Sequence, residues 1–133
     1  MYEILYISTL SDDLPVTVAA QIAAQARAKN AANDVTGYLV FDGVQFCQQF
    51  EGEQVAVQAL FELIKSDRRH AQLKVLHAGK LSRRRFKRFA VGLATLGDDE
   101  DLLDRLSQLD GHSAVNSFLA AIPKLDKKSA LSE

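Results

Sequence analysis

Hydrophobic residues recur along this chain with two periods, one typical of strands and one typical of helices. Residues 2–9 form an apolar run rich in β-branched and aromatic types, which predicts a strand. Residues 16–28 are mostly alanine, glutamine, isoleucine and valine, with apolar positions at helical spacing, which predicts a helix. We expect Asn30 and Asn33 to end this helix, because asparagine tolerates the left-handed conformation found at helix ends.

Two more strands and a second helix follow. Residues 35–41 and 44–50 predict strands joined at Asp42-Gly43, a dipeptide that is a strong signal for a hairpin turn. Residues 54–65 predict a helix, because their apolar positions fall at i, i+3, i+4 and i+7. These positions are Val57, Leu60, Phe61 and Ile64.

The remaining pattern predicts a short strand, a basic loop or single helical turn, a last strand and two helices, at residues 73–77, 83–88, 89–95, 100–109 and 113–121. The first six elements match the α+β ferredoxin-like plan, β-α-β-β-α-β, in which a four-stranded sheet carries both helices on one face. We expect the fifth strand to extend the sheet and the C-terminal helices to cover its other face. The chain then divides into a sheet domain, residues 1–95, and a C-terminal helical cap and tail, residues 96–133.

Composition narrows the class of protein. A length of 133 residues suits one domain, and a net charge of −1 argues against bulk nucleic-acid binding. No apolar run approaches the roughly 20 residues that a membrane-spanning helix needs. The single cysteine excludes an intramolecular disulfide and a thiolate zinc cluster, so a reducing, cytoplasmic setting fits best. The sequence shows no metal-ligand spacing, phosphate-binding loop or dinucleotide fingerprint.

Two polar residues stand among apolar ones. Gln48 lies between Phe46 and Phe50 on one face of a predicted strand, and a buried amide without partners costs about 1–3 kcal/mol. The hydrogen-bond partners of the Gln48 amide are therefore either nearby backbone groups or a polar ligand. Tyr6 lies in the first strand, which neighbours the third strand in the ferredoxin-like order, so it can reach Gln48. Cys47 points to the opposite face without a nearby histidine base, which favours an inert thiol.

An ordered set of short segments resembles the BLUF family, the blue-light sensors that use FAD. The resemblance covers roughly residues 2–93, and the FxQxxEG segment at 46–52 and the DxRH segment at 67–70 are its most specific parts. The matching segments are Leu5-Tyr6-Ile7-Ser8, Ala26-Arg27-Ala28-Lys29-Asn30, Val35-Thr36-Gly37-Tyr38-Leu39, Phe46-Cys47-Gln48-Gln49-Phe50-Glu51-Gly52, Ile64-Lys65-Ser66-Asp67-Arg68-Arg69-His70 and Arg85-Phe86-Lys87-Arg88-Phe89.

The resemblance implies a flavin between the two sheet-packed helices, bound by residues 1–95. Tyr6 would be the photoactive tyrosine, Gln48 would bridge it to the flavin N5 and O4 edge, and Asn30 would hydrogen-bond the flavin carbonyl edge. The remaining expected flavin contacts are Ile22 and Ile64 on the two ring faces, Lys29, and Asp67, Arg69 and His70 at the end of the pocket.

The resemblance also implies a sensor and not an enzyme. Flavin absorbs blue light, a phenol can release an electron and a proton together, and one amide can both donate and accept. Signal output would pass through positions 89 and 91, where the family often has tryptophan and methionine and this chain has Phe89 and Val91. We expect signalling to an unidentified downstream protein, and a homo-oligomer.

Two other interpretations stay open on the residues alone. The first is a ferredoxin-like binding module that has lost flavin, which the presence of Tyr6, Asn30 and Gln48 disfavours. The second is a small hydrolase such as an acylphosphatase, which would want a glycine-rich anion loop with a nearby arginine after the first strand. Residues 8–15 contain neither. The colour of the purified protein separates the three.

Overall fold

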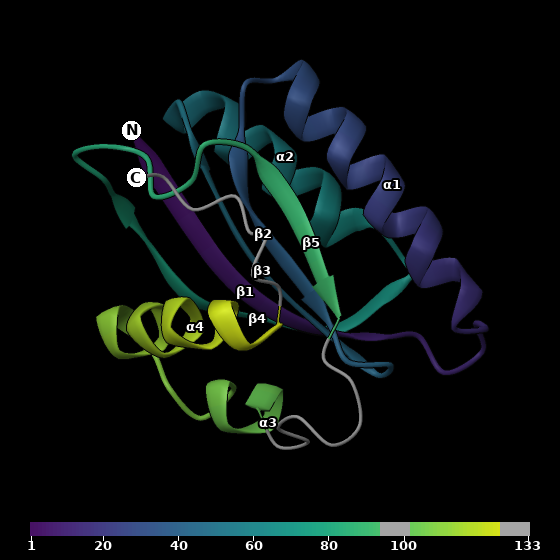
Figure 1. Cartoon of the computed structure of the whole chain (residues 1–133). Coiled ribbons are helices and arrows are strands. Elements are labelled where there is room, and N and C mark those ends of the chain that lie inside the picture. Colours follow the sequence, from purple (N-terminus) through teal and green to yellow (C-terminus); the bar gives the residue numbers. More distant parts are fainter. Residues whose placement is uncertain (94–101, 126–133) are drawn as a thin grey trace.

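The computed structural model of the chain describes residues 1–93 and 102–125 (Figure 1). Its centre is a five-stranded sheet with the order β4-β1-β3-β2-β5. The strands are β1 (Tyr2–Leu10), β2 (Thr36–Phe41), β3 (Gln45–Gly52), β4 (His70–Lys80) and β5 (Phe89–Leu93). All neighbouring strands are antiparallel except β2 and β5, which are parallel. The ferredoxin-like prediction, with a fifth strand at the edge of the sheet, is confirmed.

Helices cover both faces of the sheet and give a three-layered molecule (Figure 1). On one face lie α1 (Thr17–Ala32) and α2 (Gln54–Ser66), and on the other lie α3 (Leu102–Leu106) and α4 (Gly111–Leu125). The C-terminal helices therefore cover the second face, as the sequence predicts. No helix among residues 1–93 and 102–125 is long and apolar enough to cross a bilayer.

Alternation along β1 decides which layer each side chain joins, because successive residues of a strand point to opposite faces. Ile4 and Tyr6 are buried in a cluster with side chains of α2. Leu5 and Ile7 belong instead to the cluster that α3 and α4 complete, where Leu103 is fully buried. Both faces of β1 are therefore buried, which explains why its sequence is apolar with little alternation.

The first helix does not end where the sequence suggested. Asn33 is the C-terminal cap of α1, but Asn30 lies inside the last helical turn and is only 4% exposed. The prediction that Asn30 ends the helix is wrong. Ala28, Ala31 and Ala32 are strong helix formers, and they carry α1 past Asn30 to the cap.

Other element boundaries also differ from the predictions. Strand β4 is longer than residues 73–77, because it pairs with almost the whole of β1 from His70 to Lys80. Helix α3 is shorter than residues 100–109, and α4 is longer than residues 113–121. The last strand is described as far as Leu93. Three predicted boundaries lie outside the described residues: residues 94–95 at the end of the last strand, residues 100–101 at the start of the next helix, and the division between residues 95 and 96.

Candidate functional site

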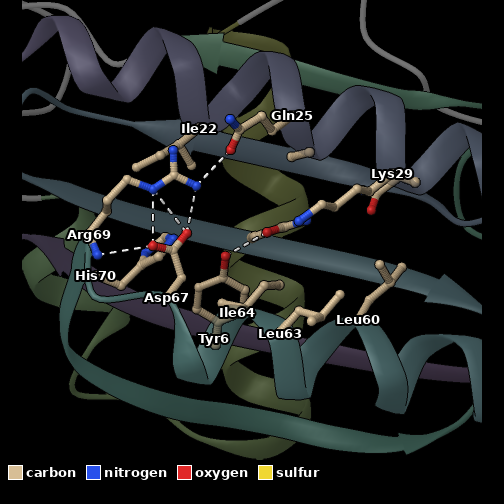
Figure 2. A pocket seen from close by; sticks show the side chains of 13 residues that line it. Tyr6, Ile22, Gln25, Lys29, Leu60, Leu63, Ile64, Asp67, Arg69 and His70 are labelled. Carbon is tan, nitrogen blue, oxygen red and sulfur yellow. Dashed lines mark hydrogen bonds and ion pairs between the residues drawn. The ribbon is translucent and has the colours of Figure 1, made fainter.

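A cleft opens between α1 and α2, with β1 and β3 as its floor. Figure 2 shows Ile22, Gln25 and Lys29 of α1 on one side and Leu60, Leu63 and Ile64 of α2 on the other. The empty space between these walls, including the part open to solvent, is about 480 Å³. The described residues that line the cleft are Tyr6, Ile22, Gln25, Ala26, Lys29, Asn30, Gln48, Leu60, Leu63, Ile64, Asp67, Arg69 and His70.

Tyr6 and Gln48 form a hydrogen-bonded pair on the floor of the cleft. They are directly opposite one another in the β1–β3 ladder, so the expected neighbourhood is confirmed. The Tyr6 hydroxyl donates to Gln48 Oε1 at 2.6 Å, and the two residues are 1% and 2% exposed. Because the carbonyl oxygen of Gln48 accepts from Tyr6, its amide nitrogen is the group that remains to donate to a ligand.

The surroundings of Tyr6 keep its phenol protonated. Burial raises the pKa of Tyr6 above its usual value, and electrostatic interactions with Cys47 and Asp67 raise it further. Phe50 and Phe61 contact its ring at centroid distances of 6.2 and 6.0 Å. A neutral, enclosed phenol with one strong acceptor is a group that can give up an electron and a proton together, but does not lose the proton alone near neutral pH.

Asn30 offers a second amide to the cleft. It lines the cleft from the last turn of α1, and among the described residues its Nδ2 has no hydrogen-bond partner. An unsatisfied buried donor costs about 1–3 kcal/mol, so such groups in native proteins call for an explanation. A ligand with an acceptor at this position supplies one.

Asp67 and Arg69 form an ion pair at one end of the cleft, away from Lys29 (Figure 2). Arg69 donates through Nε at 3.0 Å and Nη2 at 2.7 Å to the two carboxylate oxygens of Asp67. Its Nη2 also donates to Gln25 Oε1 of α1 at 2.7 Å. Hydrogen bonds from Arg69 lower the pKa of Asp67, and the same contact raises the pKa of Arg69. The pair ties the start of β4 to α1 and closes this end of the cleft.

His70, the first residue of β4, lies beside the pair. Its Nδ1 is 2.8 Å from Ser8 Oγ, and its ring contacts Phe46 and Tyr6 at centroid distances of 4.9 and 6.3 Å. Burial lowers the pKa of His70 below its ordinary value of 6.5, which favours the neutral ring. His70 therefore shapes the cleft as a neutral, largely packed side chain.

The cleft gathers most of the candidate residues, but not all of them. Ile22, Ile64 and Lys29 line it, as do the residues described above. Phe89 and Val91 do not: they lie half-buried on β5 against the apolar cluster under α1. Sequence reasoning missed Gln25 and Ser8, although Gln25 follows Ile22 at helical spacing and Ser8 shares a strand face with Tyr6.

The residues present fit a flat heteroaromatic ring. Ile22 and Ile64 give apolar walls from opposite helices. The amide nitrogens of Asn30 on α1 and Gln48 on the floor are donors without a described protein acceptor. A flavin ring has two apolar faces and an edge of nitrogen and carbonyl acceptors. The unpartnered buried nitrogen of Asn30 is the observation that this ligand explains best.

Fold and cleft together define a class, a ferredoxin-like sheet with a cleft between its two helices whose lining fits a flat ring. The family model described as "BLUF: Sensors of blue-light using FAD" matches residues 1–92. The chain belongs to the BLUF family, and it is a blue-light photoreceptor of the kind that uses a flavin.

A characterised relative supports this membership. The blue light- and temperature-regulated antirepressor BluF of Escherichia coli (strain K12) is 32% identical over 93 residues, which is 70% of this chain. The match spans only 23% of that protein's own length. The function of the remaining part of that protein therefore cannot be assigned to this chain from the match.

Solved structures of the same family share the fold. BlrB, a BLUF protein in its dark state, aligns with a TM-score of 0.70 and 28% identity over 91% of this chain and 96% of that one. Klebsiella pneumoniae BlrP1 with FMN and cyclic diGMP aligns with a TM-score of 0.69 and 27% identity over 90% of this chain and 33% of that one. BlsA in its ground state has a TM-score of 0.75 over 99% and 91% of the two chains, but at 23% identity it shows the fold alone.

Proposed function

We propose that this chain binds FAD without a covalent bond in the cleft between α1 and α2, and that Tyr6 and Gln48 are its light-sensitive switch. The 2.6 Å hydrogen bond between these two buried side chains carries the proposal. FAD rather than FMN follows the description of the family, although the related BlrP1 has been solved with FMN.

Each residue of the cleft then has a role. A bound flavin would supply the absorption of blue light and the electron-accepting ring. Tyr6 would be the donor of an electron and its phenol proton to that ring, Gln48 would relay the proton because its amide both accepts and donates, and both would return to Tyr6 when the dark state recovers. Asn30 would hold the carbonyl edge of the ring through its unpartnered Nδ2, and Ile22 and Ile64 would hold its faces.

The remaining residues of the proposed site frame the cleft. Lys29 lies exposed at the end of the cleft opposite Asp67 and Arg69 (Figure 2), and it would bind the part of the cofactor nearest to solvent. Asp67 and Arg69 close the other end, and neutral His70 packs beside Tyr6. Residues 1–95 then form the flavin-binding domain, and residues 96–133 form its helical cap and tail.

The proposed output is a change of protein contacts and not a chemical product, since Tyr6 and Gln48 return to their starting state. Phe89 and Val91, the positions that the family resemblance assigns to signal output, lie on β5 against the apolar cluster under α1. We propose signalling through an unidentified partner protein and a homo-oligomeric assembly in the cytoplasm. The antirepressor activity named for the Escherichia coli relative is consistent with an output of this kind.

The test is the absorption spectrum of the purified protein supplied with FAD. A flavin spectrum that shifts reversibly to the red under blue light supports the proposal. Tyr6→Phe and Gln48→Leu should abolish the shift while flavin stays bound. Gln45→Leu changes the same residue type on the same strand outside the cleft and should keep it. A protein that binds no flavin, or a Gln48→Leu variant with the full shift, would contradict the assignment.

A further inference from the structure

Three buried polar side chains lie on the face of β1 and β3 that is turned away from the flavin cleft. Glu3, Gln49 and Glu51, which we call the far-face cluster, are each at most 1% exposed. Gln49 Nε2 donates to Glu3 Oε1 at 3.1 Å and to Glu51 Oε1 at 3.0 Å. One amide nitrogen thus joins two buried carboxylates that stand on different strands.

The two carboxylates hold the loop that precedes β5. Arg85 donates to both oxygens of Glu3, through Nε at 2.9 Å and Nη2 at 3.0 Å. Glu51 accepts from the backbone N–H of Arg85 at 2.9 Å and from that of Phe86 at 2.9 Å. Burial alone raises the pKa of Glu3, but hydrogen bonds from Arg85 and Gln49 outweigh it, so that its pKa is lowered. The loop is therefore fixed by an ionised, buried anchor.

The far-face cluster and the switch bridge the same pair of strands. Tyr6 is opposite Gln48 in the β1–β3 ladder, and Glu3 is opposite Glu51 three residues along it. Gln48 and Gln49 are consecutive, so one side chain enters the cleft and the next enters the cluster. A shift of β3 against β1 that accompanies a change at the Tyr6–Gln48 bond therefore alters the distances between Gln49 and the carboxylates as well.

Gln49 is also held weakly enough to respond. Its Oε1 has no hydrogen-bond partner among the described residues, so the amide is fixed by its nitrogen alone. Its two bonds are 3.1 and 3.0 Å long, within the usual range, and an uncharged amide holds a carboxylate less strongly than the guanidinium of Arg85 does. A small displacement can break one of them while the fold around it stays intact.

We propose that Gln49 is a positioning residue that couples the Tyr6–Gln48 switch to residues 85–86 through Glu3 and Glu51, an output route on the opposite side of the sheet from the cleft. This inference rests on the proposed function. It gives the chain a polar connection from the switch to the start of β5, where Phe89 and Val91 offer neither an indole donor nor a sulfur atom.

The test is hydrogen exchange by NMR in the dark and under continuous blue light, on the full chain loaded with FAD. Light should speed exchange of the Arg85 and Phe86 amides about fivefold, the change expected when a hydrogen bond of typical net strength is lost. The Val44 and Gln45 amides serve as matched references. They also donate to a carboxylate, that of Asp42. Val44 lies in the turn between β2 and β3, and Gln45 is the first residue of β3, at the end of the strand away from Glu51, so neither should respond.

A variant separates coupling from general loosening. Gln49→Met removes the shared donor and should keep the red shift, while the light-minus-dark difference at residues 85 and 86 disappears. Gln45→Met lies on the same strand outside the cluster and should retain both. The dark and light comparison of the unaltered chain needs no variant. A normal red shift with unchanged exchange at Arg85 and Phe86 would overturn this inference alone, and a missing red shift would overturn the proposed function with it.

Discussion

Removing either partner of the Tyr6–Gln48 bond should destabilise the protein more than removing both. Tyr6→Phe deletes the hydroxyl and leaves Gln48 Oε1 without its donor in a position that is 2% exposed. Gln48→Leu leaves the Tyr6 hydroxyl without its acceptor in a position that is 1% exposed. The double variant removes both polar groups at once and leaves neither unsatisfied.

The expected magnitudes follow from burial. A buried donor or acceptor without a partner costs about 1–3 kcal/mol, whereas apolar replacement of both partners is nearly neutral. Each single variant should therefore lower the free energy of unfolding by about 1–3 kcal/mol. The double variant should lose less than the sum of the two, with a coupling energy of about 1–3 kcal/mol.

Urea unfolding of the flavin-free protein followed by circular dichroism measures this coupling. Bound flavin is left out because a ligand of the folded state adds its own binding free energy to the apparent stability. Tyr6→Phe combined with Ser66→Ala, a change at an exposed position of α2, is the matched cycle that should be additive.

Additive losses in the Tyr6 and Gln48 cycle would refute the reasoning. They would mean that the two side chains are each satisfied by other groups or by water, and that the bond between them contributes nothing of its own. The assignment of Tyr6 and Gln48 as the switch would then have to be reconsidered, because the proposed proton relay requires a hydrogen bond between the two side chains.

Three further predictions test the rest of the fold. Folding lowers the pKa of His70, so at a pH below about 6.5 the unfolded chain binds more protons than the folded chain. The free energy of unfolding should therefore fall as the pH is lowered. Urea titrations at about pH 7.5 and 5.5 measure this dependence, and His70→Gln should reduce it. Gly92→Ala should cost about 1–3 kcal/mol in the same assay, since its Cβ would lie 2.6 Å from Tyr38 Oη, whereas Gly79→Ala meets only His77 at 3.4 Å and should cost less than about 1 kcal/mol. Phe118→Ala in α4 should cost about 3–5 kcal/mol, because this ring is 1% exposed in the cluster shared with the sheet; a loss below about 1 kcal/mol would mean that α4 is not part of the core.

The local pattern was sufficient for the order of the elements and for the faces of the strands. Alternation in β3 placed Phe46, Gln48 and Phe50 on one face and Cys47 on the other, and the structure confirms both. The ferredoxin-like order then placed β1 beside β3, which brought Tyr6 to Gln48. These inferences succeed because a strand has a period of two and its short-range pattern reflects what each face contacts.

Boundaries and polar partners depended on information that a local pattern lacks. Asn30 has the residue type of a helix end, yet the alanines around it continue α1 and bury its amide in the cleft. The basic segment 83–88 has the composition of a solvated loop, yet Arg85 is held by Glu3, 82 residues earlier in the chain. Neither outcome follows from the segment considered alone.

The sequence by itself determined the family, the order of the five strands and four helices found among the described residues, and a tyrosine and a glutamine that face one cleft. Only the tertiary structure decided that Asn30 Nδ2 lacks a described protein partner. It also decided that the Asp67–Arg69 pair joins α1 through Gln25. It decided as well that the far-face cluster anchors the loop before β5. The physical reason is the range of the interactions. Backbone propensity and apolar periodicity act within a few residues, whereas the partner of a buried charge or amide depends on which distant strands become neighbours and in which register.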